Sequence, residues 1–510
     1  MNNNAVTTSE NQSGGFAGHP RGLTTLFFVE MWERFSYYGM RALLLLYMVE
    51  SVERGGLGLS EKTGGAIYGL YTMMVYLLAL PGGWLADHYF GLKKSVLYGG
   101  YIIVLGHACL ALPFTETFFV GLLLIAIGTG LLKPNISSMV GELYPAHEQA
   151  KRDAGFSIFY MGINIGAFVS PFITGYLGEQ VNWHYGFAIA GLGMVIGVAY
   201  YKFSENRLEN VGLPPVQTSV ESKTAKEKNI TTWLWILSVG LILLVAMMIL
   251  KIVVIDPVLL AQASAYVIGC SSILYFAYIF LFENLTAEEK NKVKVIFLFF
   301  LLSIAFYSGY EQQGSSLNLF AKRYTNMVVG NFEMPAGWLQ SIPPIAVIIF
   351  SPLFAWLWVK LSHKKLNPSI PVKLSMGLIF AGLGYLVMMK ASQIVAHQGK
   401  VLPTWLIVTY IIHTFGEICL YPVGLSAVTK LSPKRVVGQM MGLWFMSLAF
   451  GNLIAGIFAG QFDEKIIGED SSYMAGLFFN VAIAMFIAGI IGLILFKPIK
   501  ILLEKNNPSK

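Results

Sequence analysis

Residues 30–41, EMWERFSYYGMR, place four ionisable side chains inside the first long apolar segment of the chain. On a helix with about 100° per residue, the polar members of this stretch fall within an arc of roughly 140°. They are Glu30, Glu33, Arg34, Tyr37, Tyr38 and Arg41. An ionised group at the bilayer centre costs about 2.5–3.5 kcal/mol or more, so this stripe must face a partner or a wet cavity. We expect it to be functional; the alternative is a structural ion pair that locks helix packing.

The composition indicates a membrane protein with many spans. The chain has 510 residues, of which 55% are hydrophobic and 12% are charged, which does not fit a soluble enzyme. The net charge of +7 comes from basic residues in short loops between apolar segments, a pattern of membrane topology and not of nucleic-acid binding. The three cysteines lack disulfide or metal spacing, so we expect no metal and no cofactor. They are Cys109, Cys270 and Cys419.

Apolar segments of about 20 residues predict fourteen transmembrane helices, grouped as six, two and six. We expect an N-terminal tail at 1–22, a six-helix bundle at 23–203, a linker with two additional helices at 204–290, a second six-helix bundle at 291–503 and a tail at 504–510. The spans are placed near 23–53, 64–87, 94–113, 117–141, 152–177, 184–203, 231–251, 260–283, 293–322, 336–361, 371–391, 403–430, 436–461 and 473–502.

The basic residues predict the orientation in the membrane. An even number of spans puts both termini on one side, and most of the 35 lysines and arginines lie in the loops of that side. An excess of basic residues marks the cytoplasmic side, so both termini are expected inside the cell. The polar residues 1–20 do not fit a cleavable signal peptide.

The loop after the second span, GWLADHYFGLKK at 83–94, has a degenerate second copy, PLFAWLWVKLSHKK, at 352–365. The first copy resembles the loop signature of the major facilitator superfamily, which implies two six-helix bundles. Asp87 can cap the N-terminus of a neighbouring helix, and Gly91 permits a tight turn. We expect this loop to act in conformational change and gating.

Three motifs together identify the branch of that superfamily. The first-span motif, FYMGINIG at 159–166 and GEICLYPVG at 416–424 resemble the signatures of the proton-dependent oligopeptide transporter family. The pair of extra helices also resembles bacterial members. The resemblance covers almost all of the chain. It implies uptake of di- and tripeptides across the inner membrane, driven by the proton gradient.

The ionisable residues away from the span ends carry one surplus acid. The acids are Glu30, Glu33, Glu311 and Glu417, and the bases are Arg34, Arg41 and Lys133. One bound proton would balance this set, which suits a one-proton carrier. An excess carboxylate among ion pairs is easier to protonate, because of desolvation and like charge. Which carboxylate holds the proton is a coupled question.

The depth of these residues in the membrane predicts two pairs. Glu33 and Lys133 lie at depths that agree within about 5 Å, towards the inside. Arg41 and Glu311 both lie in the outer half, where a pair would help to close the outside. In the family, the matching glutamates and lysine act in proton coupling, and the matching arginine and span-seven acid act in gating. The alternative for Lys133 is a residue that snorkels from a span end.

A carrier of many peptides should hold the two charged ends of the peptide and leave the middle loose. Glu417 would take the ammonium, and Arg41 and Lys133 would take the carboxylate, so the ligand would bridge the two halves. The family resemblance implies the same assignment. Amphipathic and hydrogen-bonding groups would line the pocket. They are Tyr37, Tyr38, Tyr76, Asn164, Asn318 and Trp444.

Two departures from the family bear on mechanism and substrate range. Animal members carry a functional histidine in span two, but residues 68–76 contain none, so coupling should depend on carboxylates. His107 and His413 are expected to be packed and neutral. Tyr421 stands where many relatives have serine, which affects the expected substrate range.

Two other classes of function stay open. A transporter of the same fold for nitrate or a peptide-like metabolite is one, and Glu417 argues against a pure anion carrier because an anion needs no ammonium acceptor. A channel, receptor or membrane enzyme is the other. No nucleotide loop, metal cluster or nucleophile–base spacing supports an enzyme.

Overall fold

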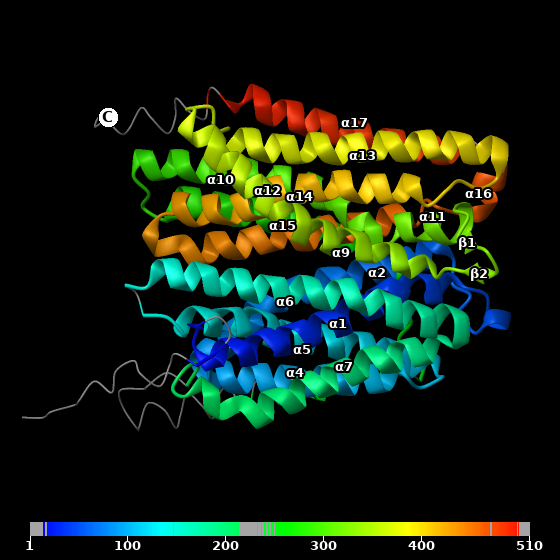
Figure 1. Ribbon diagram of the computed structural model, residues 1–510, viewed down its shortest axis with the longest axis horizontal. Helices are drawn as coiled ribbons and strands as arrows, with labels where there is room; N and C mark the ends of the chain where they lie inside the picture. The colour runs from blue at the N-terminus through cyan, green and yellow to red at the C-terminus, as the bar shows by residue number, and fades with distance from the viewer. Residues whose placement is uncertain are drawn as a thin grey trace, which may run out of the picture. The chain divides into compact units, whose positions relative to one another are not determined.

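The computed structural model describes residues 14–15, 18–145, 147–213, scattered positions between 232 and 248, 250–469, 472–496 and 498. Most of these residues lie in helices (Figure 1). One short antiparallel ribbon joins β1 (Val328–Val329) to β2 (Phe332–Glu333). The fold is that of an all-α polytopic membrane protein, which confirms the predicted fold class.

Eleven helical stretches within the described residues are long and apolar enough to cross a membrane. Helix α1 (Arg21–Val49) is 29 residues long but is not among them, because it carries the charged stripe. Helix α9 (Pro257–Phe282) corresponds to the second predicted linker helix, and Asp256 caps its first turn by accepting from the amide of Val258. The first predicted linker helix, near 231–251, lies largely outside the described residues.

The segment that follows α1 contains the predicted glycine turn. The helices are α2 (Glu61–Leu77), α3 (Ala79–Leu85), the π-helical η3 (Ala86–Phe90) and α4 (Gly91–Leu110). Gly91 has a φ of 71°, a positive value that favours glycine. This confirms the tight turn expected there. The chain continues through α5 (Thr115–Glu142), α6 (Gln149–Tyr176), the π-helical η4 (Leu177–Val181) and α7 (Trp183–Ser204).

The predicted span near 293–322 is broken in two. Helix α10 (Ala287–Tyr310) passes into the 3₁₀ turn η6 (Glu311–Gly314), and α11 (Ser316–Tyr324) follows. Ser315, with φ −127° and ψ −102°, leaves the helical conformation between them. The remaining elements are η7 (Ala336–Ser341), α12 (Ile342–His363), α13 (Ile370–Gln398), α14 (Thr404–Leu431), α15 (Val437–Ala459), α16 (Glu464–Glu469) and α17 (Tyr473–Ile494).

The chain forms two compact units. Unit 1 comprises Met1–Gly39, Leu78–Ser170 and Phe187–Ile255, and unit 2 comprises Met40–Leu77, Pro171–Gly186 and Asp256–Lys510. Helix α1 contributes its first part to unit 1 and its last part, from Met40 to Val49, to unit 2. The division into two six-helix bundles and a linker stays a prediction.

Within unit 1, glycines bring α4 and α5 into close contact. A Cβ added at Gly99 would lie 2.6 Å from the carbonyl oxygen of Gly128, and one added at Gly106 would lie 2.9 Å from that of Gly121. Small residues of this kind allow helix backbones to approach closely in a membrane. This close contact holds α5 and its residues firmly against α4.

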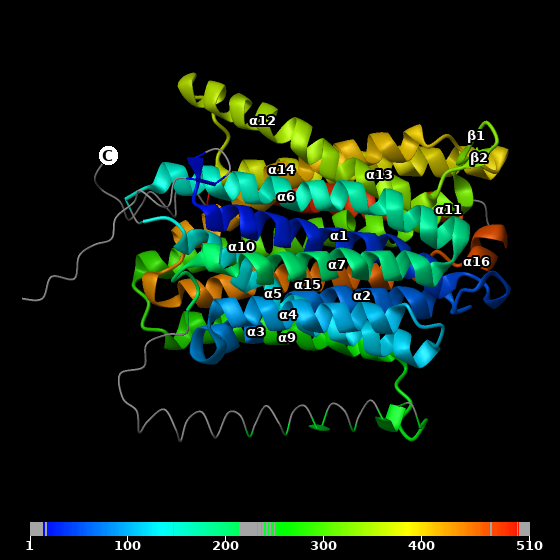
Figure 2. The same ribbon diagram turned by 60° about the horizontal axis from the view of Figure 1, so that its bottom comes forward.

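Within unit 2, α2 packs against α15, and α9 packs against both helices (Figure 2). A Cβ at Gly65 would lie 2.5 Å from the carbonyl oxygen of Gly456, so these backbones are in direct contact. An apolar cluster that includes Met73, Ile268 and Leu453 fills the space between the three helices. Helix α2 therefore packs against two helices from the second half of the chain, in addition to its contacts with α1.

Candidate transport site

The first-span motif forms a buried ion cluster in unit 1. The Nε atom of Arg34 lies 3.1 Å from Oε1 of Glu30, one helical turn away, and Arg34 also forms an ion pair with Glu33. No more than 4% of any of these three side chains is exposed. The prediction that the stripe avoids lipid is confirmed for these three residues.

Aromatic and basic side chains complete this cluster. The guanidinium of Arg34 lies 5.4 Å from the ring centroid of Tyr37, a cation–π distance. The rings of Tyr37 and Tyr38 meet edge to face at 5.3 Å. Lys133, on α5, is close enough to interact electrostatically with Glu30. Lys133 therefore lies near the motif as expected, although the predicted contact with Glu33 stays a prediction.

The predicted pair of Arg41 and Glu311 is present in unit 2. Nη2 of Arg41 lies 2.5 Å from Oε2 of Glu311, and both side chains are at least 94% buried. The Nε atom of Arg41 donates to the hydroxyl of Tyr68 at 2.7 Å. The break after α10 positions Glu311, because the residue starts η6 instead of continuing a regular helix. The pair is confirmed, and its role in gating stays a prediction.

Gly314 makes room for this pair. A Cβ at Gly314 would lie 2.7 Å from Nε of Arg41 and would also collide with the hydroxyl of Tyr68. A larger residue at 314 would therefore displace the guanidinium. The sequence analysis did not select Gly314 or Tyr68 as site residues. Neither residue lies in one of the quoted motifs, so no motif pointed to them.

Glu417, on α14, belongs to the same group of charges in unit 2. Its carboxylate accepts a hydrogen bond from the hydroxyl of Tyr310, at the end of α10. Glu417 is close enough to Arg41 and Glu311 to interact with both electrostatically. The ring of Tyr307 is similarly close to Tyr76 and Tyr421. Unit 2 thus gathers one base, two acids and several tyrosines.

Other predicted site residues have structural contacts. The side-chain amide of Asn318 is fully buried and donates to the carbonyl oxygen of Ala42 at 2.8 Å, so it joins α11 to α1. Asn164 donates to the carbonyl oxygen of Tyr160 within its own helix. Trp444 is buried and packs against Gly424. Their places in a substrate site stay predictions.

Asp87 does not cap a helix in this structure. It lies in η3, is exposed, and forms no hydrogen bond with another described residue. The role of Asp87 in capping and gating therefore stays a prediction.

The two intramembrane histidines are packed. Nε2 of His107 lies 2.6 Å from the hydroxyl of Ser36, and Nε2 of His413 lies 3.2 Å from the carbonyl oxygen of Ala381. Both residues are at least 98% buried. These contacts fit the expected packing roles.

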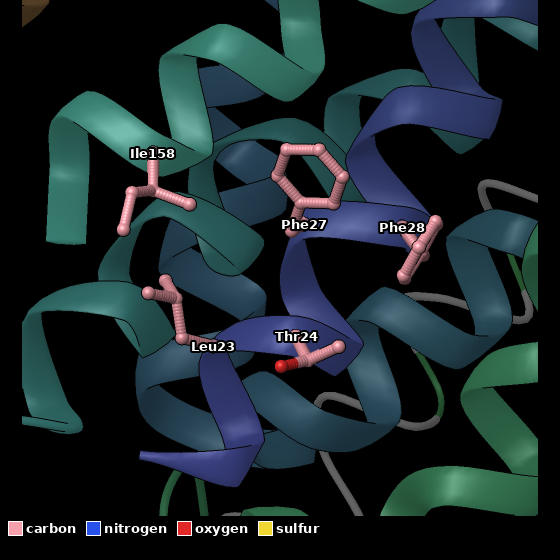
Figure 3. A pocket seen from close by; sticks show the side chains of 5 residues that line it. All are labelled: Leu23, Thr24, Phe27, Phe28 and Ile158. Carbon is pink, nitrogen blue, oxygen red and sulfur yellow. The ribbon is translucent and has the colours of Figure 1, made fainter. Parts of the chain in front are cut away.

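A small cavity in unit 1 is too apolar to bind a charged substrate. It is lined by Leu23, Thr24, Phe27, Phe28 and Ile158 (Figure 3). The ionised ends of a small polar molecule would lose their hydration there without gaining a charged partner. The buried charges described above are the better candidates for the site.

The fold and these charges define the class of protein: a multi-pass membrane transporter of the major facilitator fold. A family model described as POT family matches residues 93–474. The chain belongs to the POT family.

Named relatives cover nearly the whole chain. One is "Peptide transporter YePEPT" of Yersinia enterocolitica subsp. palearctica, which is 39% identical over 98% of this chain and 99% of its own length. Another is the "Di-/tripeptide transporter" of Lactococcus lactis subsp. cremoris, which is 35% identical over 85% of this chain and 87% of its own. A crystal structure of a peptide transporter POT in complex with sulfate is 38% identical, with a TM-score of 0.87, and the match covers 96% and 97% of the two chains.

Proposed function

We propose that this protein is a proton-coupled symporter that imports di- and tripeptides across the bacterial inner membrane by alternating access. The observation that carries the proposal is the pair of buried ion clusters on α1. Ionised groups are costly inside a membrane and mark the paths of ions and substrates. Membership of the POT family and the names of the relatives support the substrate class.

The proton is assigned to the surplus acid of these clusters. Glu30 and Glu33 share one arginine, so the two carboxylates carry one negative charge more than Arg34 neutralises. Lys133 can neutralise this excess negative charge in one state of the transport cycle. In another state, a bound proton can neutralise it. We assign proton coupling to Glu30, Glu33, Arg34, Lys133 and Glu311. Entry of a positive charge adds about 2.3 kcal/mol per 100 mV of membrane potential.

Arg41 cannot bind Glu311 and a peptide carboxylate at the same time. Its guanidinium is engaged by Glu311 and Tyr68, so it must leave Glu311 before it can hold a peptide carboxylate. Protonation of Glu311 removes the charge that holds it. Proton binding at Glu311 thereby releases Arg41 both for opening and for substrate. Coupling follows, because substrate binding and proton binding then favour the same state.

Recognition of the peptide ammonium is assigned to Glu417. The residue is half-buried, and its carboxylate already accepts from a neutral donor, Tyr310. An ammonium is a stronger partner than a phenol, because it adds the attraction between opposite charges to the hydrogen bond. We assign the peptide carboxylate to Arg41 and Lys133, and the surrounding surface to Tyr37, Tyr38, Tyr76, Asn164, Asn318 and Trp444.

The orientation is proposed from the basic loops. The start of α1 at Arg21 would lie on the cytoplasmic side with both termini, and its end at Val49 would lie outside. With this orientation, Arg41 and Glu311 close the outer side.

The second candidate is a transporter of the same fold for a different small substrate, such as nitrate or a peptide-like metabolite. Glu417 favours peptides over nitrate, since a carboxylate repels an anion and gains only from a positively charged ligand.

Uptake of a labelled dipeptide into proteoliposomes tests the proposal. With an inward proton gradient we expect accumulation above the external concentration, and without it only equilibration. Nitrate and a dipeptide without a free amino group, offered as unlabelled competitors, should leave uptake unchanged. Accumulation that does not depend on the gradient, or competition by nitrate, would contradict the proposal.

A further inference from the structure

Glu179 is a fully buried carboxylate that the transport chemistry above does not use. It lies in η4, directly after α6, and none of its side chain is exposed. Its Oε2 atom accepts from Nζ of Lys322 at 2.9 Å and from the backbone amide of Ala336 at 3.1 Å. Its Oε1 atom accepts from the backbone amide of Gly337 at 2.9 Å. One carboxylate therefore has three donors from two other segments.

These donors belong to α11 and η7, which are far from Glu179 along the chain. We call Glu179, Lys322, Ala336 and Gly337 the clasp. The clasp lies at the Val49 end of α1, since a Cβ at Gly337 would lie 3.4 Å from Cβ of Ala42. The clasp therefore joins η4, which belongs to the first predicted bundle, to α11 and η7, which precede α12.

The neighbouring contacts join the same segments but carry no charge. Nε1 of Trp338 donates to the carbonyl oxygen of Phe172 at 3.0 Å, and Nε2 of Gln180 donates to the carbonyl oxygen of Glu333 at 3.0 Å. The rings of Tyr176 and Phe332 stack at 6.4 Å. Polar and aromatic contacts of this kind can slide or exchange with water. Among these contacts between described residues, the one with Glu179 brings a fully buried carboxylate to the junction.

We propose that Glu179 is a gating residue that holds the outer side closed through the clasp. This inference depends on the proposed alternating access, in which the outer ends of the two bundles must separate. Separation would remove all three donors from a carboxylate at once. The clasp therefore favours the closed outer side, whereas loss of the charge should favour the open one.

The clasp differs from the Arg41–Glu311 pair in how it opens. Lys322 is 28% exposed and two of the three donors are backbone amides, which do not titrate. Opening would therefore exchange these three donors for water at the carboxylate. The clasp sets the balance between the two states, and Arg41 with Glu311 couples that balance to the proton.

Labelling of a cysteine at position 42 tests the proposal. The full-length protein carries Ala42→Cys, with Cys109, Cys270 and Cys419 replaced by alanine, in right-side-out vesicles with an impermeant maleimide outside. Ala42 is fully buried in the closed structure, so labelling reports outer opening. We expect Glu179→Gln to raise the labelling rate about tenfold and Lys322→Gln about threefold. A tenfold change corresponds to about 1.4 kcal/mol, the size of one hydrogen bond to a charged group.

Two matched controls keep the test decisive. Glu333→Gln removes a charge nearby whose carboxylate is exposed, and labelling should stay within twofold of the parent. Ala190→Cys replaces Ala42→Cys as a reporter of general loosening, since Ala190 is fully buried in unit 1. Equal rates for Glu179→Gln and Glu333→Gln would overturn the proposal, as would a similar rise at position 190. Labelling requires no substrate, so failure of the clasp is distinct from failure of dipeptide accumulation by the parent protein.

Discussion

The two ion clusters of α1 differ in how far apart their members lie in the sequence. Glu30 and Arg34 are one helical turn apart, whereas Arg41 and Glu311 are separated by 270 positions. A cluster within one turn moves with its helix and stays paired in every conformation. A pair between distant segments breaks when those segments separate. We therefore propose charge storage for the first cluster and state-dependent closure for the second.

The largest effect is expected from Glu33→Gln in the local cluster. A glutamine cannot carry the transported proton, so uphill accumulation should disappear while exchange of dipeptide across the membrane continues. Both activities can be measured in the same proteoliposomes, with and without an imposed gradient. Unchanged uphill accumulation would remove Glu33 from proton coupling.

The second-largest effect is expected on the free energy of unfolding, which should distinguish the two clusters. Glu311→Gln removes the carboxylate that Arg41 contacts, and breaking a buried pair in this way costs about 3–5 kcal/mol. Glu33→Gln should cost less, because Arg34 keeps Glu30. Thermal unfolding in detergent should therefore show a larger drop for Glu311→Gln. Equal drops in unfolding temperature would mean that the loss of one partner destabilises the two clusters to the same extent.

Glu417→Gln should act on substrate affinity. We expect the KM for dialanine to rise at least about tenfold, which corresponds to about 1.4 kcal/mol for a lost ion pair with the ammonium. The KM for a dipeptide with a blocked amino group, poor in the parent, should change little. A uniform change for both substrates would argue that Glu417 supports the fold and does not bind the ammonium.

Tyr68→Phe should have the smallest effect. It removes the oxygen that accepts from Nε of Arg41 and leaves the ion pair with Glu311, so the loss is about 1–3 kcal/mol for one buried donor. The rate of gradient-driven uptake should change a few-fold. A loss as large as that of Glu311→Gln would show that the phenol, and not the carboxylate, holds the arginine.

The sequence predicted the clusters whose chemistry is visible in the residue types. Four ionisable groups on one stripe required burial against partners, and membrane depth alone brought Arg41 to Glu311. The sequence did not predict the break after Tyr310, because the residues on both sides are compatible with one continuous helix. That break positions Glu311. Tyr68, which accepts from Arg41, is an ordinary apolar-span tyrosine in the sequence.

Contacts between distant segments were the other omission. The sequence analysis did not select Glu179, whose three donors come from α11 and η7. Asn318 was selected as a ligand, yet its amide donates to the backbone of α1. A polar residue gives its type in the sequence but not its partner.

Simultaneous recording of proton and peptide entry tests the central claim most directly. Proteoliposomes loaded with a pH indicator receive external dialanine, and lumenal acidification is followed together with labelled peptide. If the carboxylate that the buried bases leave unbalanced carries the proton, peptide entry acidifies the lumen in the parent protein. Glu33→Gln then exchanges peptide without acidification. Peptide accumulation in the parent protein with no accompanying proton entry would contradict it.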